Sequence, residues 1–417
     1  MSAYIDITFY LIGLITMLVI FTPFSPMTID LVNFSRDTQI AIYRHRHKLW
    51  AIGIFSLGLV LLRSLDSVMG AQSIDQVDKW FWITIATIGA LTMMFWSGYV
   101  PYVMTPPSKH KILTAKEADQ ILKPDDVILG LAYGDEVRAY LRDEIARPHY
   151  FKDTLNKTPL TVSYCILCNS GAAYNSELNG QALNLRCVTA YNNNVIYYDP
   201  ATGNFIQQLD GSVVYGPDKG KSLEAYPVVM ASWEEWKNAH PDTKFFSSPP
   251  ITLRDKMVGL MLGMMIPISK LSKRTKPWHR IQGKLDPRLP AMSFVYGIDI
   301  NGDARAYSLN KLKDQRVINE EVGGKPIVVV YDGQHDVGGI FSAEVDSQKL
   351  TFEALTEQDN SVIARDQETG SLWTATGKSV EGPLKGQTLK PVSHINKLFW
   401  FSWALFKPHT KVSDPKT

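Results

Sequence analysis

Three long apolar runs occupy the first hundred residues of the chain. Ile7 to Phe24 and Trp80 to Val100 are uncharged over 18 and 21 positions, and Leu49 to Leu65 is apolar apart from one arginine. Each run approaches the length of about 20 residues that a helix needs to cross the hydrocarbon core of a bilayer. Aromatic residues at both ends of the third run suit the two membrane interfaces. The pattern therefore predicts a membrane module over residues 1–104, with three transmembrane helices and a lipid bilayer as its partner.

Beyond a Thr-Pro-Pro-Ser linker at Thr105 the pattern changes to short runs separated by turn residues. A first helix is predicted over Leu113 to Leu122, because Thr114 and Glu117 have the spacing of a capping box. From Val127 onwards, alternating apolar and polar positions between Gly, Asn and Asp turns are typical of hairpins. We therefore expect an α+β fold that is mainly β.

The predicted strands and helices of this part follow from the same pattern. The hairpin strands are Ile128 to Tyr133 with Glu136 to Tyr140, Ala172 to Leu178 with Ala182 to Cys187, Val195 to Tyr198 with Asn204 to Leu209, and Phe294 to Ile300 with Ala304 to Tyr307. Further β-rich runs cover Leu160 to Tyr164 and Ile327 to Tyr331. Short helices are expected over Leu141 to Arg147, Ser232 to Ala239 and Lys397 to Phe406.

A second copy of the same motifs follows the first at a nearly fixed distance. Tyr164-Cys-Ile-Leu-Cys recurs as Tyr331-Asp-Gly-Gln-His, 167 positions later, and an Arg-Ala-Tyr and an Asp-x-x-Thr-Gly recur at the same offset. A Gly-Pro-x-Lys-Gly, at Gly216 and Gly382, is one residue out of phase. Motifs that repeat in a fixed order predict a tandem duplication.

The duplication predicts the domain organisation. We expect a first strand-rich lobe at residues 113–250, a linker at 251–285 and a second, degenerate lobe at 286–412, the lobes being related by a pseudo-twofold. Within the linker, the twelve apolar residues from Met257 to Ile268 have basic flanks. They predict either a helix lying on an anionic leaflet or an ordinary helix between the lobes.

The motifs resemble one bacterial and archaeal family, the domain of unknown function thirty-one seventy-nine. The resemblance rests on Arg-Ala-Tyr at Arg138, Tyr-Cys-x-Leu-Cys-Asn-Ser at Tyr164, Tyr-Asp-x-x-Thr-Gly at Tyr198, Gly-Pro-x-x-Gly at Gly216 and Trp-x-x-Trp at Trp233. It extends from about residue 116 to 411 and implies a two-halved, strand-rich domain. Selenocysteine in some relatives implies redox work.

This chain departs from the family pattern at two places. Members usually carry proline after the first cysteine, where Ile166 stands here. They also carry a His-Glu ahead of an Asn-Asp, which His149 and Asp153 match only with a one-residue shift. The resemblance supplies no reaction, so the expected chemistry depends on the residues themselves.

Charge and basic residues bear on partners and orientation. A net charge of +2 with 20% charged residues argues against nucleic acid as a partner. The stretch between the first two apolar runs holds four basic residues, at Arg36, Arg44, Arg46 and Lys48. An excess of Lys and Arg marks the cytoplasmic side. We therefore predict a multi-pass inner-membrane protein with a cytoplasmic C-terminal domain; an extracytoplasmic domain, which the family resemblance favours, is the alternative.

Cys165 and Cys168 carry the candidate chemistry. A zinc site of four cysteines is excluded within one chain, because Cys187 is the only other cysteine, and a c-type haem would need His where Asn169 stands. Three interpretations stay open: a dithiol–disulfide centre, a thiolate site for zinc or Cu(I), and inert packing. We expect Cys165 to be the exposed nucleophile and Cys187 to point into the core.

Two further groups accompany the cysteines. His149 either holds a thiolate or shuttles a proton, or it closes the predicted helix before it. Asp332 and His335 stand at the cysteine positions of the second copy, where degeneration explains them better than a weak Asp-x-x-His metal pattern. The predicted function is therefore thiol–disulfide redox activity at the membrane with a small-molecule or protein thiol partner. The alternative is a non-catalytic metal-binding or scaffold module.

Overall fold

The computed structural model describes residues 2–71, 77–249, 253, 256–257, 259–260, 271, 273–355, 362–392 and 395–413. The chain forms two compact units. The first unit contains the N-terminal helices up to Thr105, the strand Arg186–Tyr191 and part of the 252–265 segment, and the second unit contains the strand-rich remainder. The predicted linker helix over Met257 to Ile268 lies almost wholly outside the described residues.

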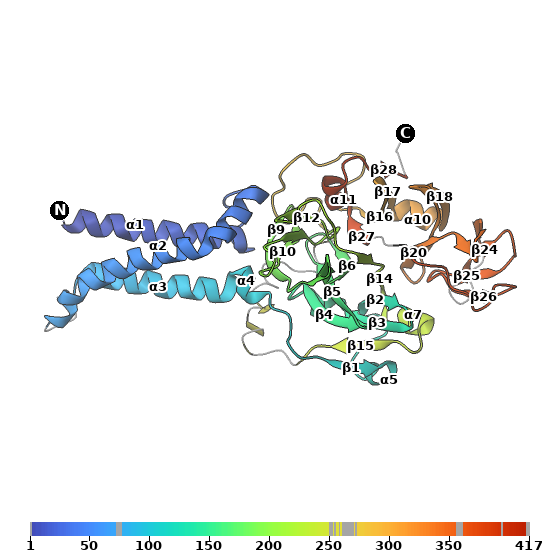
Figure 1. The fold of residues 1–417 in the computed structure, drawn as a ribbon, viewed down its shortest axis with the longest axis horizontal. Helices are drawn as coiled ribbons and strands as arrows, with labels where there is room; N and C mark the ends of the chain where they lie inside the picture. Colours follow the sequence, from blue (N-terminus) through green and yellow to red (C-terminus); the bar gives the residue numbers. More distant parts are fainter. Residues whose placement is uncertain are drawn as a thin grey trace. The chain divides into compact units, whose positions relative to one another are not determined.

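Three long helices make up most of the first unit (Figure 1). Its elements are α1 (Ser2–Phe21), η1 (Thr22–Phe24), α2 (Arg36–Met69), α3 (Lys79–Gly98), α4 (Val100–Val103) and β9 (Arg186–Tyr191). α1, α2 and α3 are each long and apolar enough to cross a membrane, which confirms the predicted membrane helices. The second helix is longer than expected, at 34 residues. It begins at Arg36, so the four basic residues assigned to a loop lie on a helix instead.

Close packing and one ion pair hold these helices together. A Cβ atom on Gly13 would lie 2.6 Å from Cγ of Leu57, and one on Gly53 would lie 2.6 Å from Cε of Met17. Small residues allow such close approach of helices in a bilayer. Arg63 of α2 does not extend free to an interface, because its Nε lies 2.6 Å from Oδ1 of Asp6 on α1. Large side chains such as Phe55 on the outer faces are exposed, as lipid-facing residues are.

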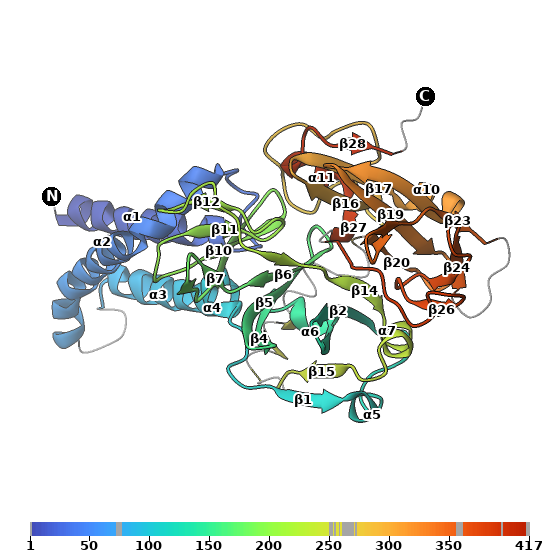
Figure 2. The ribbon, with the colours of Figure 1, turned by 45° about the vertical axis from the view of Figure 1, so that its right-hand side comes forward.

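The second unit begins with a half that we call the first half, residues 111–185 and 192–247. Its elements are β1 (Lys111–Thr114), α5 (Ala115–Ala118), β2 (Val127–Tyr133), β3 (Glu136–Leu141), α6 (Arg142–Ile145), β4 (Tyr150–Leu155), β5 (Thr158–Cys165), β6 (Ser170–Asn175), β7 (Glu177–Leu178), β8 (Gln181–Ala182), β10 (Asn194–Tyr198), β11 (Phe205–Gln207), β12 (Val213–Tyr215), β13 (Ala225–Tyr226), β14 (Val229–Ser232), α7 (Trp233–Ala239) and β15 (Lys244–Ser247). One sheet has the order β1-β15-β3-β2-β14 and another the order β13-β6-β5-β4. β10, β11 and β12 are neighbours in a third sheet (Figure 2).

The second half, residues 294–412, has a closely similar order of elements. They are β16 (Phe294–Ile300), β17 (Asp303–Ser308), α10 (Leu309–Gln315), β18 (Val317–Val322), β19 (Lys325–Asp332), β20 (Val337–Ser342), β21 (Glu344–Val345), β22 (Gln348–Lys349), β23 (Phe352–Ala354), β24 (Val362–Asp366), β25 (Leu372–Thr374), β26 (Ser379–Glu381), β27 (Ile395–Phe399), α11 (Trp400–Phe406) and β28 (Lys411–Val412). Its sheets have the orders β27-β16-β17-β28, β18-β19-β20 and β23-β24-β25-β26. Strands β2, β4, β5 and β6 begin 167 residues before β16, β18, β19 and β20.

Each half has a core of its own, and two further clusters combine residues of both halves. Tyr140 and Tyr164 lie in the core of the first half, and Tyr307 and Tyr331 lie in the core of the second. Trp236 packs in a cluster that includes Val328 and Trp373 from the other half. A mixed, mainly β fold is therefore confirmed.

Several predicted boundaries were wrong in detail. The predicted helix from Leu113 is a strand, β1, followed by the single turn of α5, although Thr114 and Glu117 do form the expected capping box. The strand β1 forms because it pairs with β15, which is far away in sequence. The predicted hairpin around Asn179 is only the two-residue pair β7 and β8, and Cys187 lies on a separate strand, β9. The last helix begins at Trp400, because the preceding residues form β27.

Candidate functional site

The two cysteines flank a tight connection between neighbouring strands. β5 ends at Cys165, and β6 begins at Ser170. Asn169 adopts a left-handed conformation with φ of 55°, which asparagine tolerates better than most residues. Its side chain holds the turn, because Oδ1 accepts a hydrogen bond from the Tyr164 hydroxyl at 2.6 Å and Nδ2 donates to the Lys397 carbonyl.

Polar side chains surround the sulfur of Cys168. Nδ2 of Asn194 donates to Sγ at 3.2 Å, and Oγ of Ser170 lies 3.0 Å from the same sulfur. Oε1 of Gln208 accepts from Ser170 at 2.8 Å and from Asn194 at 2.7 Å. The single hydroxyl proton of Ser170 can be donated either to Oε1 of Gln208 or to Sγ of Cys168. The network therefore suits both a thiol and a thiolate.

The orientation of the Asn194 amide is fixed by its other partners. Oδ1 accepts hydrogen bonds from Nε2 of Gln207 at 2.5 Å and from the backbone N–H of Leu209 at 3.1 Å. These donors identify that atom as the oxygen, so the amide must present its N–H groups to Cys168 and Gln208. Asn194 is completely buried, which strengthens the hydrogen bond that it donates.

This environment shifts the pKa values of the two thiols in opposite directions. Burial raises the pKa of Cys168, but hydrogen bonds from Cys165, Ser170 and Asn194 outweigh it and lower the pKa to about 7. Burial is the main reason why the pKa of Cys165 lies well above its usual value. Sγ of Cys165 lies 3.4 Å from the Asn193 carbonyl, to which its proton can also be donated. Cys168, not Cys165, is therefore the more acidic thiol.

Both sulfurs are sealed from solvent. Cys165 and Cys168 have no exposed surface, and both are free thiols. The expectation that Cys165 is an exposed nucleophile is therefore wrong, because strands β5 and β6 bury both ends of the connection. Cys187 is buried as expected, and burial alone raises its pKa.

His149 lies near the cysteine strand but does not reach the sulfurs. Its backbone N–H donates to the Ile145 carbonyl at 2.8 Å, and its Nδ1 lies 3.1 Å from the Tyr164 carbonyl oxygen. Among the described residues, no hydrogen bond joins the imidazole to Cys165 or Cys168. Burial lowers the pKa of His149, which favours the neutral ring. These contacts match the alternative in which His149 closes the short helix before it.

Asp153 is likewise engaged in the framework. Its Oδ2 accepts a hydrogen bond from the Tyr140 hydroxyl at 2.8 Å and lies 3.5 Å from Nε of Arg138. Glu320 stands 167 positions later and makes the same two contacts, with Tyr307 and Arg305. Both halves thus use a carboxylate here to anchor a tyrosine and an arginine.

The second half has an ion pair in place of the thiols. Nδ1 of His335 lies 2.6 Å from Oδ2 of Asp332, and Nε2 lies 3.9 Å from Oε1 of Glu235 in the first half. The hydrogen bond with Asp332 is the main reason why the pKa of His335 is raised. Within the described ranges, no group of three or more His, Cys, Asp or Glu side chains is placed to hold a metal ion.

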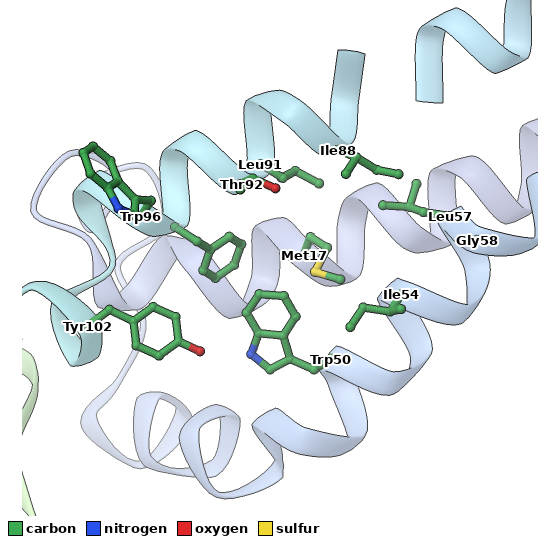
Figure 3. A pocket seen from close by; sticks show the side chains of 11 residues that line it. Met17, Trp50, Ile54, Leu57, Gly58, Ile88, Leu91, Thr92, Trp96 and Tyr102 are labelled. Carbon is green, nitrogen blue, oxygen red and sulfur yellow. The ribbon is translucent and has the colours of Figure 1, made fainter. Parts of the chain in front are cut away.

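Each of the two units contains a cavity. In the first unit, a cavity of about 480 Å³ is lined mainly by apolar and aromatic side chains, with Trp50, Met17 and Tyr102 pointing into it (Figure 3). In the second unit, a cavity of about 370 Å³ is lined by Gly171 and Leu209. Gly171 and Leu209 directly follow Ser170 and Gln208 in the sequence. Two members of the hydrogen-bond network around Cys168 are therefore sequence neighbours of residues that line the cavity.

From the sequence, Ser170 is expected near the cysteines only as part of a tight turn that offers N–H donors, and Asn194 only as part of a polar run that forms a loop or contacts a ligand. Gln208 is not assigned to this site. The usable signal was the position of Ser170 directly after the motif. Asn194, on β10, reaches the sulfur from 26 residues further along the chain, and Gln208, directly after β11, lies 40 residues further along and binds Asn194 and Ser170. No local pattern indicates such contacts.

Comparison with known proteins identifies one family. The model of the family described as "Protein of unknown function (DUF3179)" matches residues 98–410. No curated protein and no solved structure matches the chain.

Proposed function

Because the chain belongs to the DUF3179 family, whose description assigns no activity, we propose its function from the geometry of the thiol site. The protein acts as a membrane-anchored thiol–disulfide redox protein in which Cys165 and Cys168 alternate between dithiol and disulfide. The metal-binding alternative is less well supported, because no third ligand side chain joins the two cysteines among the described residues.

The hydrogen bond from Asn194 to Sγ of Cys168 carries this proposal. A cysteine that merely packs is expected to resemble Cys187, whose pKa burial raises. Cys168 is equally buried, yet its pKa is lowered because Cys165, the hydroxyl of Ser170 and the fixed amide of Asn194 form hydrogen bonds to its sulfur. Thiolates are the nucleophiles of thiol–disulfide exchange. A cysteine that only packs in an apolar core does not need hydrogen-bond donors oriented towards its sulfur.

The proposed reaction is exchange with a small disulfide, RSSR, and it requires the turn to open because both sulfurs are buried. The thiolate of Cys168 attacks one sulfur of RSSR, the S–S bond breaks, and one RS⁻ leaves and takes a proton. Cys165 then attacks the mixed disulfide at Cys168 and releases the second thiol. Two protein thiols thus lose two electrons and two protons to form one disulfide, and RSSR becomes two RSH. The order is the reverse of that expected from the sequence, because Cys168 has the lower pKa.

The membrane unit and the repeated elements extend the proposal. The four basic residues on the first turns of α2 support a cytoplasmic location of that helix end and of the C-terminal domain. A fusion of a reporter that is active only outside the cytoplasm to Thr417 is expected to give no signal.

The offset of 167 residues supports a tandem duplication, in which the second half completes the fold without thiols of its own.

Trapping experiments on the full chain in detergent test the thiol chemistry. After incubation with glutathione disulfide, the parent is expected to lose two thiols and to gain a Cys165–Cys168 disulfide, detected by peptide mass spectrometry. Cys165→Ser is expected to trap a mixed disulfide at Cys168, whereas Cys187→Ser behaves like the parent. If all three thiols of the parent stay reduced while an unfolded sample is oxidised, the packing interpretation replaces this proposal.

A further inference from the structure

The second unit contains two cavities at corresponding places, and each is lined by residues of both halves. The larger, of about 370 Å³, includes Gly171, Gly297 and Trp403 in its lining. The smaller, of about 60 Å³, includes Gly338, Gly130 and Trp236. Each residue of the first set lies 167 positions from one residue of the second. In both cavities a glycine faces the tryptophan, where a Cβ atom would lie 2.4 Å from the indole ring.

The two cavities differ in charge. Asp299 and Lys407 in the larger cavity correspond at the same offset to Ala132 and His240 in the smaller one. Asp210 corresponds, one residue out of phase, to Thr376. Because the smaller cavity is built on the same framework without these acidic groups, the framework does not require them.

The charged groups of the larger cavity form one connected cluster. Nζ of Lys407 lies 2.9 Å from Oδ2 of Asp299 and 3.4 Å from Oδ2 of Asp210. The three side chains keep 22–26% of their surface exposed, so a solute can reach them. Two carboxylates face one ammonium group, which leaves the cluster with one surplus negative charge. Tyr174, Tyr226 and Trp403 provide aromatic surface beside it.

We propose that the larger cavity binds a small organic cation, a primary ammonium group attached to a flat apolar body. The surplus carboxylate charge attracts the ammonium group, and aromatic side chains favour both a cation and an apolar ring. The volume suits a small ligand, since ligand sites begin at about 300 Å³. This inference does not depend on the thiol reaction, because the sulfurs do not line the cavity.

Titration calorimetry on the full chain in detergent tests the charge preference. Three probes of similar shape are compared: 2-phenylethylammonium, 2-phenylethanol and 3-phenylpropionate, each corrected for heat from empty micelles. The cation is expected to bind saturably and at least about tenfold more tightly than the other two, which corresponds to about 1.4 kcal/mol. Tighter binding of the anion, equal binding of all three, or no saturable binding of any probe overturns the proposal.

Substitutions taken from the smaller cavity locate the site. The double variant Asp210→Thr, Asp299→Ala carries the residues found at the corresponding positions of the other half, so the framework is expected to fold. It is expected to lose at least about tenfold in affinity for 2-phenylethylammonium. Thr376→Val, in the smaller cavity, is the matched control and is expected to leave the affinity unchanged. If the double variant folds and binds the cation as the parent does, the cavity is not the site.

Discussion

The two halves of the strand-rich unit place different chemistry on a shared set of contacts. In the first half the connection between β5 and β6 has Cys165 and Cys168, while the corresponding connection in the second half has Asp332 and His335. The tyrosine before each pair is buried and bonds to the residue that ends the turn, Asn169 or Asp336. The hydrogen bond that closes the turn is therefore part of the shared fold, whereas the pair of residues inside the turn differs between the halves.

The same division holds elsewhere in the unit. Nε1 of Trp236 donates to Thr243 at 2.9 Å, and Nε1 of Trp403 donates to Thr410 at the same distance. Contacts that occur in both halves are best explained by folding, whereas residues that differ at matching positions are candidates for function. The predictions below separate these two groups.

The largest effect is expected at the paired tryptophans. Trp236→Ala and Trp403→Ala each remove a buried ring that packs on a glycine, and each is expected to lower the free energy of unfolding by about 3–5 kcal/mol. Denaturant titrations followed by near-ultraviolet circular dichroism measure this. Because the two sites make the same contacts, their losses are expected to agree to within about 1 kcal/mol. A large loss at only one site would show that the halves do not share a framework.

A smaller but unequal effect is expected at the paired carboxylates. Asp153→Ala removes a side chain that is 5% exposed and leaves the buried Arg138, at 6% exposure, with Glu136 as its remaining carboxylate partner, which is 36% exposed and 3.5 Å away. We expect it to cost about 2–3 kcal/mol in the free energy of unfolding. Glu320 is 31% exposed, and Arg305 keeps Asp303 as a partner, so Glu320→Ala is expected to cost about 1 kcal/mol. Equal costs would contradict the view that burial decides the difference.

The extent to which the sequence predicted these features depends on the range of the interactions. Local patterns were sufficient for the membrane helices, for the capping box at Thr114 and for the Asp199 turn, because the contacts involved lie within one element or turn. They were insufficient for β1, which is a strand only because it pairs with β15.

The thiol site shows the same limit. The motif identified Cys165 and Cys168, but the hydrogen bonds around Cys168 involve Asn194 on β10 and Gln208 directly after β11, both far along the chain. Burial also could not be judged from the motif, since β5 lies inside a sheet, between β6 and β4, and this pairing is not visible in the motif. The proposed reaction therefore starts at Cys168, whereas the motif alone favours Cys165.

Opposite pH dependences are expected at the two turns. The pKa of Cys168 is lowered from 9.0 to about 7, so its folded form releases a proton more readily. Its contribution to stability therefore grows from pH 7 towards pH 9 and is lost as the pH falls through 7. The pKa of His335 is raised above 6.5, so its contribution is present below pH 6.5 and is lost as the pH rises through the folded value.

Thermal unfolding of two variants across pH 5 to 9 separates these contributions. The difference between the parent and Cys168→Ser is expected to grow with pH above about 7, and the difference between the parent and His335→Gln is expected to shrink with pH above about 6.5. Cys187→Ser is the control for the loss of a buried thiol and is expected to give a difference independent of pH up to about 8, because burial raises the pKa of the folded thiol and the unfolded thiol ionises only nearer pH 9. Parallel pH profiles for the first two variants would remove the distinction between the turns.

The smallest effect is expected at the repeated Asp-x-x-Thr-Gly turns. In the first half, the backbone N–H and the hydroxyl of Thr202 donate to Oδ2 of Asp199 at 2.8 and 2.7 Å. In the second half, Thr369 donates in the same way to Asp366 at 2.6 and 2.7 Å. Thr→Val at either position keeps the shape and the backbone donor but removes one hydroxyl. The lost hydrogen bond is expected to lower the free energy of unfolding by about 0.5–1.5 kcal/mol.

The second turn supplies a reason for a slight inequality. The Thr369 hydroxyl also lies 2.7 Å from the Ser371 hydroxyl, and Asp366 accepts a further hydrogen bond from the Trp373 indole at 2.8 Å. Each carboxylate keeps two donors when its threonine is replaced: Asp199 keeps the backbone N–H groups of Asn184 and Thr202, and Asp366 keeps the indole of Trp373 and the backbone N–H of Thr369. The Thr369 hydroxyl contacts Ser371 in addition, so we expect Thr369→Val to be the more costly of the two, by about 0.5 kcal/mol in denaturant titration. Equal costs, or a larger cost at Thr202, would mean that the link between the Thr369 and Ser371 hydroxyls adds nothing to the stability of its turn.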